Sequence, residues 1–175
     1  WPDMPYDASR LLFDVAAEFG VRFVLLRGGA TKVRDSDVDP PPEARPEALE
    51  AMLASVERDV QRFHESAGDA MRKVVLAPTT PTWSVHVPEL REFARAARAL
   101  GIGLHSHMSE SVDYVTFCRD VHGCRPIEFC ERHDWLGPDV FFAHLVHLQP
   151  HELQMLARSG TGMSHCPQSN CRLGS

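Results

Sequence analysis

The chain has 175 residues, a length that suits one domain. Hydrophobic residues make up 43% and charged residues 24%, so an apolar core with a polar surface can form. The net charge of −6 argues against a nucleic-acid partner, and no apolar run approaches the roughly 20 residues that span a bilayer, so no membrane association is expected.

The N-terminal stretch and the cysteines favour a cytoplasmic protein. WPDMPYDASR lacks a basic segment followed by an apolar one, so no signal peptide is predicted. The cysteines are odd in number and none has a CxxC partner, which is typical of reduced thiols. They are Cys118, Cys124, Cys130, Cys166 and Cys171.

The first half of the chain alternates helical and strand-like patterns. A helix over 7–19 is expected to begin at Asp7, and a strand near 22–28 follows. The polar, proline-rich stretch 32–46 is typical of a long loop, and such loops often act as substrate lids. A second helix over 46–66 then precedes a strand near 73–78. The predicted buried face of the first helix consists of Leu11, Leu12, Val15, Ala16 and Phe19.

The second half continues the same alternation. Prolines are favoured at the first turn of a helix and glycines just after its end, and both mark helix boundaries here. Helices are expected over 88–101, 111–119, 125–133 and 150–160, and strands near 102–107, 139–144 and 161–166.

Strands that alternate with helices predict a parallel sheet in an α/β fold. No GxGxxG or P-loop sequence follows a strand, which disfavours the nucleotide-binding folds. A (β/α)₈ TIM-type barrel fits better, although a whole barrel needs eight strands and about 250 residues. We therefore expect residues 1–175 to form a partial barrel domain, about strands 3 to 7, with no second domain.

Two histidines and a glutamate surround the end of the central strand, in GLHSHMSE. His105 and His107 lie two residues apart, so their side chains point the same way from a strand. Neutral imidazole is a common ligand of divalent metals, and Glu110 could move protons at a metal-bound water. The alternative is a hydrogen-bonded histidine pair beside an exposed glutamate.

Further histidines end the next two strands. His144, in FFAHLVHL, should neighbour the strand of His107, which strengthens the hypothesis of a functional site. His147 is expected to leave the strand. His165, in SHCPQSN, repeats the pattern, and we expect a structural or supporting role for it.

HSHMSE, FFAHLVHL and SHCPQSN together resemble the amidohydrolase superfamily, in its branch of metal-dependent aminohydrolases of N-heterocycles. The resemblance covers essentially the whole chain. It implies that His107 binds one divalent metal, with zinc expected and iron possible. It also implies that Glu110 carries a proton to the substrate ring and that His144 contacts the attacking water.

The resemblance implies metal-assisted hydrolytic deamination with release of ammonia. The family also uses an HxH pair on its first strand and an aspartate on its eighth; this chain has no HxH other than residues 105–107 and ends at Ser175, so neither is expected in it. One imidazole does not make a catalytic zinc site, which needs about three protein ligands. We therefore expect the chain alone to be inactive, and its function to be that of a longer protein.

Weaker features bear on the substrate. Arg27, in LLRGGAT, could bind a ring carbonyl, or it could form a salt bridge at the strand end. Trp83, in APTTPTWS, could stack on a flat ring or lie at the rim. Guanine deaminases usually carry an arginine where this chain has Thr79 and Thr80. The loops are more similar to those of isoxanthopterin deaminases, and then of 8-oxoguanine deaminases.

This resemblance implies a small heterocyclic substrate, an isoxanthopterin-like pterin. The alternatives within the branch are an 8-oxoguanine or guanine deaminase, a triazine hydrolase and an adenosine-thioether deaminase. A non-catalytic barrel scaffold is the alternative outside catalysis. A homo-oligomer is possible.

Overall fold

The structure is a computed structural model that describes residues 7–33 and 45–175. Five parallel strands form one sheet in the order β1-β2-β3-β4-β5, which confirms the predicted parallel arrangement. The strands are β1 (Phe23–Arg27), β2 (Arg72–Leu76), β3 (Leu104–Met108), β4 (Val140–His144) and β5 (Gly162–Ser164). The helices are α1 (Ala8–Glu18), α2 (Leu49–Phe63), the short 3₁₀ turn η2 (Val87–Glu89), α3 (Leu90–Ala99), α4 (Val112–His122), α5 (Pro126–Arg132), α6 (Pro150–Ser159) and α7 (Pro167–Leu173).

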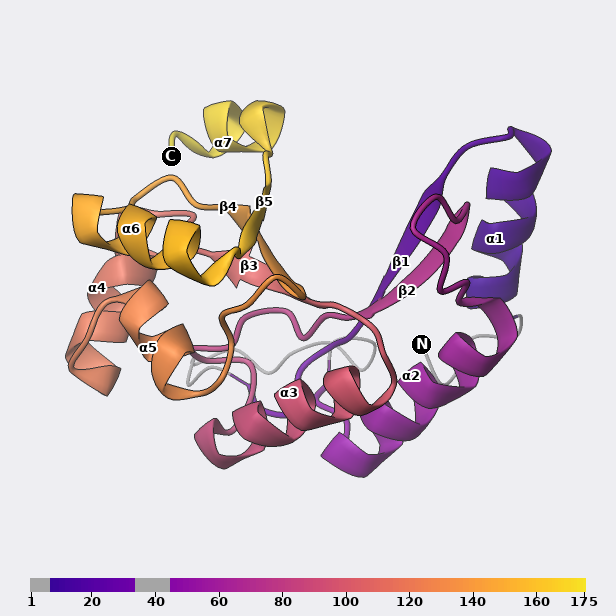
Figure 1. The fold of residues 1–175 in the computed structure, drawn as a ribbon. Helices are drawn as coiled ribbons and strands as arrows, with labels where there is room; N and C mark the ends of the chain where they lie inside the picture. Colours follow the sequence, from indigo (N-terminus) through magenta and orange to yellow (C-terminus); the bar gives the residue numbers. More distant parts are fainter. Residues whose placement is uncertain (1–6, 34–44) are drawn as a thin grey trace.

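The strands form an open arc, and helices α1 to α6 lie along its outer side (Figure 1). β1 and β2 align five residue pairs, as do β3 and β4, whereas β2 and β3 align only Leu76 with Leu104. β2 ends at Leu76, and the loop after it stays close to β3, because the Pro78 carbonyl accepts the Ser106 hydroxyl at 2.7 Å and the Thr79 carbonyl accepts the His107 N–H at 3.3 Å.

The core lies between the sheet and the helices on its outer side. Met52 and Val56 of α2 are fully buried, and so are the large side chains at the centre of the core. The indole N–H of Trp135 donates to the Leu90 carbonyl at 2.8 Å, which satisfies its only buried polar group. The central members are Leu90, Phe93, Leu104, Met108, Ile127, Trp135 and Phe142. Among the described residues, no helix has the length and apolarity that a bilayer crossing requires.

The first helix begins as predicted but buries a different face. The Asp7 side chain accepts the Arg10 N–H at 3.0 Å and caps α1. Phe13 and Ala16 are the residues that α1 buries, and the Phe13 ring packs on Phe23 and Phe63. Because α1 lies at the edge strand β1, the predicted apolar face is not covered by the described residues. Leu11, Leu12, Val15 and Phe19 are all exposed, and of that predicted face only Ala16 is buried.

The C-terminal stretch also differs from its prediction. The strand expected near 161–166 ends at Ser164, and residues Pro167–Leu173 form the unpredicted helix α7. Pro167 has no backbone N–H and a fixed φ, so it suits the first position of a helix. Most of the loop predicted over 32–46, including its proposed lid, lies outside the described residues.

Candidate active site

Three residues selected from the sequence meet where β3 and β4 end. The strands pair in parallel with His107 opposite Ala143 and Met108 opposite His144. The rings of His107 and His144 stack, with centroids 5.4 Å apart and an interplanar angle of 27°. Glu110 follows β3, and its Oε1 lies 3.3 Å from His144 Nε2. The parallel register thus brings His107, Glu110 and His144 into one cluster.

The His107 imidazole is held by the backbone of the loop after β2. Its Nδ1 donates to the Thr79 carbonyl at 2.8 Å, and the same carbonyl accepts the Ser106 hydroxyl at 3.0 Å. A proton on Nδ1 leaves the lone pair on Nε2, which is the form that a metal ligand requires. The side chain is exposed, so Nε2 can be reached from outside the core.

His144 lies in a strained turn. Its φ is 74° and that of Leu145 is 53°, and Ser109 after β3 has a φ of 49°. Left-handed backbone costs an L-residue roughly 1–3 kcal/mol, and such strain gathers at functional sites. The Leu145 N–H donates to the Met108 carbonyl at 3.0 Å, and the next two N–H groups donate to the Ser109 carbonyl. These bonds hold the end of β4 against the end of β3 and position the His144 ring.

A residue that was not among the predicted site residues lies behind His144. His144 Nδ1 and Asn170 Oδ1 lie 2.7 Å apart, and both side chains are buried. Asn170 lies on α7, 26 residues further along the chain. The available signal for Asn170 is the polar stretch CPQSN after β5, but its residues are expected at the end of a strand and not in a helix.

His105 is buried and makes structural contacts instead of facing the site. It is 4% exposed, and its Nδ1 donates to the Phe141 carbonyl at 2.9 Å. Burial lowers its pKa to about 4, so the ring is neutral at pH 7. Its centroid lies 6.4 Å from that of His107. His105 therefore packs β3 against β4, while His107 carries the accessible nitrogen.

Arg27 forms the salt bridge that the sequence left open as an alternative. Its Nη1 and Nη2 donate to the two carboxylate oxygens of Glu47 at 3.1 Å each, and its Nε donates to Ser55 at 3.1 Å. The side chain is 8% exposed. To bind a ring carbonyl, the Arg27 guanidinium would have to break hydrogen bonds that already fit its planar geometry. The substrate contact predicted for Arg27 competes with this ion pair.

Trp83 lies half-buried beside α4. Its ring centroid is 4.6 Å from that of Tyr114 and 5.2 Å from that of Phe117. These contacts anchor the loop after β2 to the helix after β3, and the predicted stacking on a substrate ring stays a prediction. His165 lies exposed after the end of β5.

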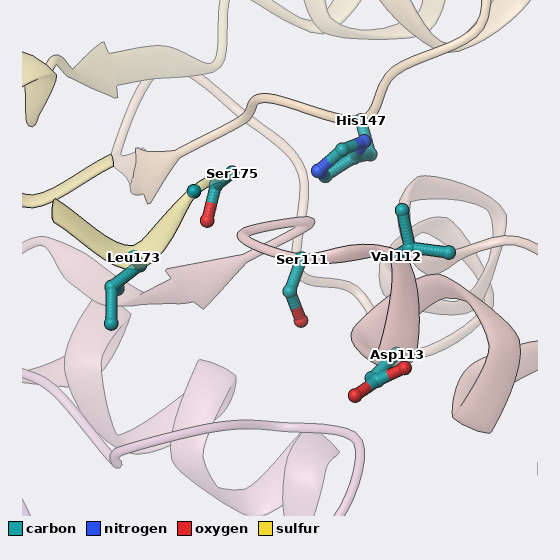
Figure 2. A pocket seen from close by; sticks show the side chains of 7 residues that line it. Ser111, Val112, Asp113, His147, Leu173 and Ser175 are labelled. Atoms are coloured by element: carbon teal, nitrogen blue, oxygen red, sulfur yellow. The ribbon is translucent and has the colours of Figure 1, made fainter. Parts of the chain in front are cut away.

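A pocket adjoins the cluster but does not contain it. Figure 2 shows its labelled lining around the start of α4, His147 and the end of the chain. His147 follows β4 in a loop, as predicted. Ser111 follows Glu110 in sequence, which places the pocket beside the Glu110–His144 contact. The lining is Ser111, Val112, Asp113, His147, Leu173, Gly174 and Ser175.

The donor set fits one metal ligand rather than a complete metal site. Within the part of the chain that the structure describes, no three His, Cys, Asp or Glu side chains are arranged to hold a metal ion. His107 presents a free Nε2, whereas His144 faces Glu110 and His105 is buried. A catalytic zinc needs about three protein ligands, so further ligands would be required beside His107.

Comparison with known proteins relates the chain to one family. The model of the amidohydrolase family matches residues 3–175. An isoxanthopterin deaminase from an unknown prokaryotic organism is 50% identical over 175 residues, which are all of this chain and 36% of that protein. The 8-oxoguanine deaminase of Pseudomonas aeruginosa is 35% identical over 161 residues, which are 92% of this chain and 35% of the relative. The chain thus spans about a third of the length of these relatives.

Solved structures show the same fold. An amidohydrolase from an environmental sample of the Sargasso Sea has a TM-score of 0.85 and 48% identity, over 99% of this chain and 38% of that one. The atrazine chlorohydrolase of Arthrobacter aurescens, crystallised with zinc, has a TM-score of 0.79 and 22% identity, over 93% of this chain and 35% of its own. The five-stranded sheet is thus a partial segment of a TIM-type barrel, and the chain belongs to the amidohydrolase family.

Proposed function

We propose that the protein containing this chain is a metal-dependent hydrolytic deaminase of an oxidised bicyclic N-heterocycle, with an isoxanthopterin-like pterin as substrate. The observation that carries this proposal is the His107–Glu110–His144 cluster at the ends of β3 and β4. Parallel α/β barrels build their sites at this end of the strands. The identity of 50% to an isoxanthopterin deaminase supports the choice of substrate over 8-oxoguanine, for which the relative is 35% identical.

The proposal gives each residue of the cluster one task. His107 Nε2 would hold one divalent metal, and we propose zinc because a related fold was crystallised with it. The bound metal supplies Lewis acidity that brings hydroxide within reach at neutral pH. Its remaining ligands would come from residues outside this chain.

Glu110 is the proton carrier in this proposal. Its side chain is 27% exposed, so it can exchange protons with water, and it touches His144 Nε2 at 3.3 Å. Deamination needs a proton delivered to the ring nitrogen beside the attacked carbon, and a carboxyl group at the edge of the site can deliver it. His144, only 5% exposed and in contact with Glu110, would orient the attacking water.

The test is ammonia release by the whole, metal-loaded protein from isoxanthopterin, 8-oxoguanine, a triazine and an adenosine thioether. We expect turnover of isoxanthopterin, its loss in Glu110→Gln with metal content unchanged, and normal turnover in Glu131→Gln, which alters an exposed carboxylate on α5. Bound metal with turnover of another substrate would discard the pterin assignment. Absence of metal would favour a non-catalytic scaffold.

A further inference from the structure

The Asn170 side chain holds His144, whereas backbone carbonyls hold the two histidines of β3. His107 donates Nδ1 to Thr79 and His105 donates Nδ1 to Phe141, both to main-chain oxygens. His144 Nδ1 instead meets the side chain of Asn170 at 2.7 Å. We propose that Asn170 is a positioning residue that holds His144 with its proton on Nδ1 and its Nε2 lone pair facing Glu110. This inference rests on the proposed function of the cluster.

The orientation of the Asn170 amide in the structure, with Oδ1 towards the ring, gives the hydrogen bond its direction. An amide oxygen accepts only, so His144 Nδ1 must carry the proton. A neutral imidazole has a single N–H, which leaves Nε2 as an acceptor 3.3 Å from Glu110 Oε1. In that tautomer Nε2 can accept a proton from Glu110 when the Glu110 carboxyl group is protonated. The Asn170 amide holds His144 in this tautomer without placing a charge beside the ring.

The placement of Asn170 indicates that the contact is a specific one. Asn170 is the only residue that α7 buries, and the other side chains of this short helix are partly or fully exposed. Its backbone is already satisfied, because its N–H donates to the Cys166 carbonyl and its carbonyl accepts the Ser175 N–H. A buried amide needs a hydrogen-bond partner, because an unpaired polar group is costly to remove from water. His144 is that partner.

The opposite amide orientation defines the competing arrangement. If Asn170 turned its NH₂ towards His144, Nδ1 would accept and the proton would lie on Nε2, facing Glu110. The two arrangements differ in which ring nitrogen is protonated, and ¹⁵N chemical shifts of the imidazole distinguish them directly.

The experiment uses the whole, metal-loaded protein labelled with ¹⁵N-histidine, with the His144 signals assigned by their loss in His144→Gln. We expect the proton on Nδ1 in the wild type and in Asn170→Asp, which keeps an acceptor at the same place. Asn170→Leu should give mixed tautomers and lower kcat by roughly 10- to 100-fold with KM unchanged. Gln168→Ala, an exposed change on the same helix, should alter neither measurement.

Two results would overturn the inference: a wild-type proton on Nε2, or an Asn170→Leu variant with unchanged tautomer and unchanged kcat. If Asn170→Leu does not fold, the wild-type and Asn170→Asp spectra still decide. Failure of the proposed function is a separate result, since it appears as lack of turnover on every substrate while the tautomer measurement remains informative.

Discussion

At the scale of single residues, burial of His105 links stability to pH. The pKa of His105 falls from 6.5 to about 4 because burial disfavours the charged ring. The unfolded chain therefore binds more protons between these two values, so the free energy of unfolding rises with pH across that interval. The stabilisation is fully present above about pH 6.5 and is lost as the pH falls towards 4. Its upper limit is about 3 kcal/mol.

The His105→Asn variant tests this link. Asparagine does not titrate, so we expect a smaller increase in unfolding free energy between pH 4.5 and 6.5 than in the wild type. Urea unfolding at several pH values measures the difference, and His165→Asn, at an exposed position, serves as the control. Equal pH dependence in wild type and His105→Asn would contradict the prediction.

Single residues also show which parts of the candidate site can be predicted from the sequence and which cannot. His107, Glu110 and His144 could be selected because each lies at a predicted strand end, and the parallel register then brings them together. The contact between His144 and Asn170 could not be foreseen, because 26 residues and an unpredicted helix separate them. The left-handed turn at His144 likewise has no local signal, since no glycine marks it.

At the scale of elements, the ends of β1 and β2 approach so closely that only glycine fits. A Cβ at Gly28 would lie 1.7 Å from the Ala77 carbonyl oxygen, a backbone atom. We expect Gly28→Ala to lower the free energy of unfolding by about 1–3 kcal/mol or more, which is typical of overpacking. Gly68→Ala is the matched control, because nothing lies within 4 Å of its Cβ. Urea unfolding compares the two, and similar effects would refute the steric argument.

A buried carboxylate ties α6 to α5 and to the loop after β4. Glu152 is fully buried and accepts Arg125 Nε at 2.7 Å and the Gln149 N–H at 2.9 Å. Arg125 also donates to the His147 carbonyl at 2.8 Å, close to the site. Glu152→Ala leaves Arg125 charged and without this partner, which should cost about 3–5 kcal/mol of unfolding free energy.

The exposed pair Arg95–Glu92 provides the comparison for Glu152. Glu92→Ala should cost less than about 1 kcal/mol, because solvent screens the pair. Chemical denaturation of both variants measures the contrast. If Glu92→Ala lowered the free energy of unfolding as much as Glu152→Ala, burial would not be the deciding factor.

Among the elements, periodicity located the strands but not every buried face. Strand ends could be placed within about two residues, because apolar runs are bounded by glycine, proline or polar residues. The exposed face of α1 was predicted as buried, because periodicity shows that a face is apolar and not whether a neighbour covers it. β5 is short and α7 begins at Pro167, because a change from apolar to polar residues predicts where a strand ends but not that a helix follows.

At the scale of the whole molecule, the chain is a segment of a larger barrel. Within the described residues, β1 and β5 each pair on one side only. Apolar side chains near these edges are exposed, including Val24, Leu26 and Met163. Unpaired strand edges and exposed apolar surface favour self-association.

We therefore predict that residues 1–175 produced alone self-associate, bind less than one metal per chain and release no ammonia from any substrate in the panel. Five strands do not close a barrel, and His107 alone does not hold a catalytic zinc, which needs about three protein ligands. Light scattering, metal analysis and the ammonia assay test the three parts, with the whole protein as control. A monomeric segment that binds one zinc per chain and turns over isoxanthopterin would show that this part of the barrel contains a complete site.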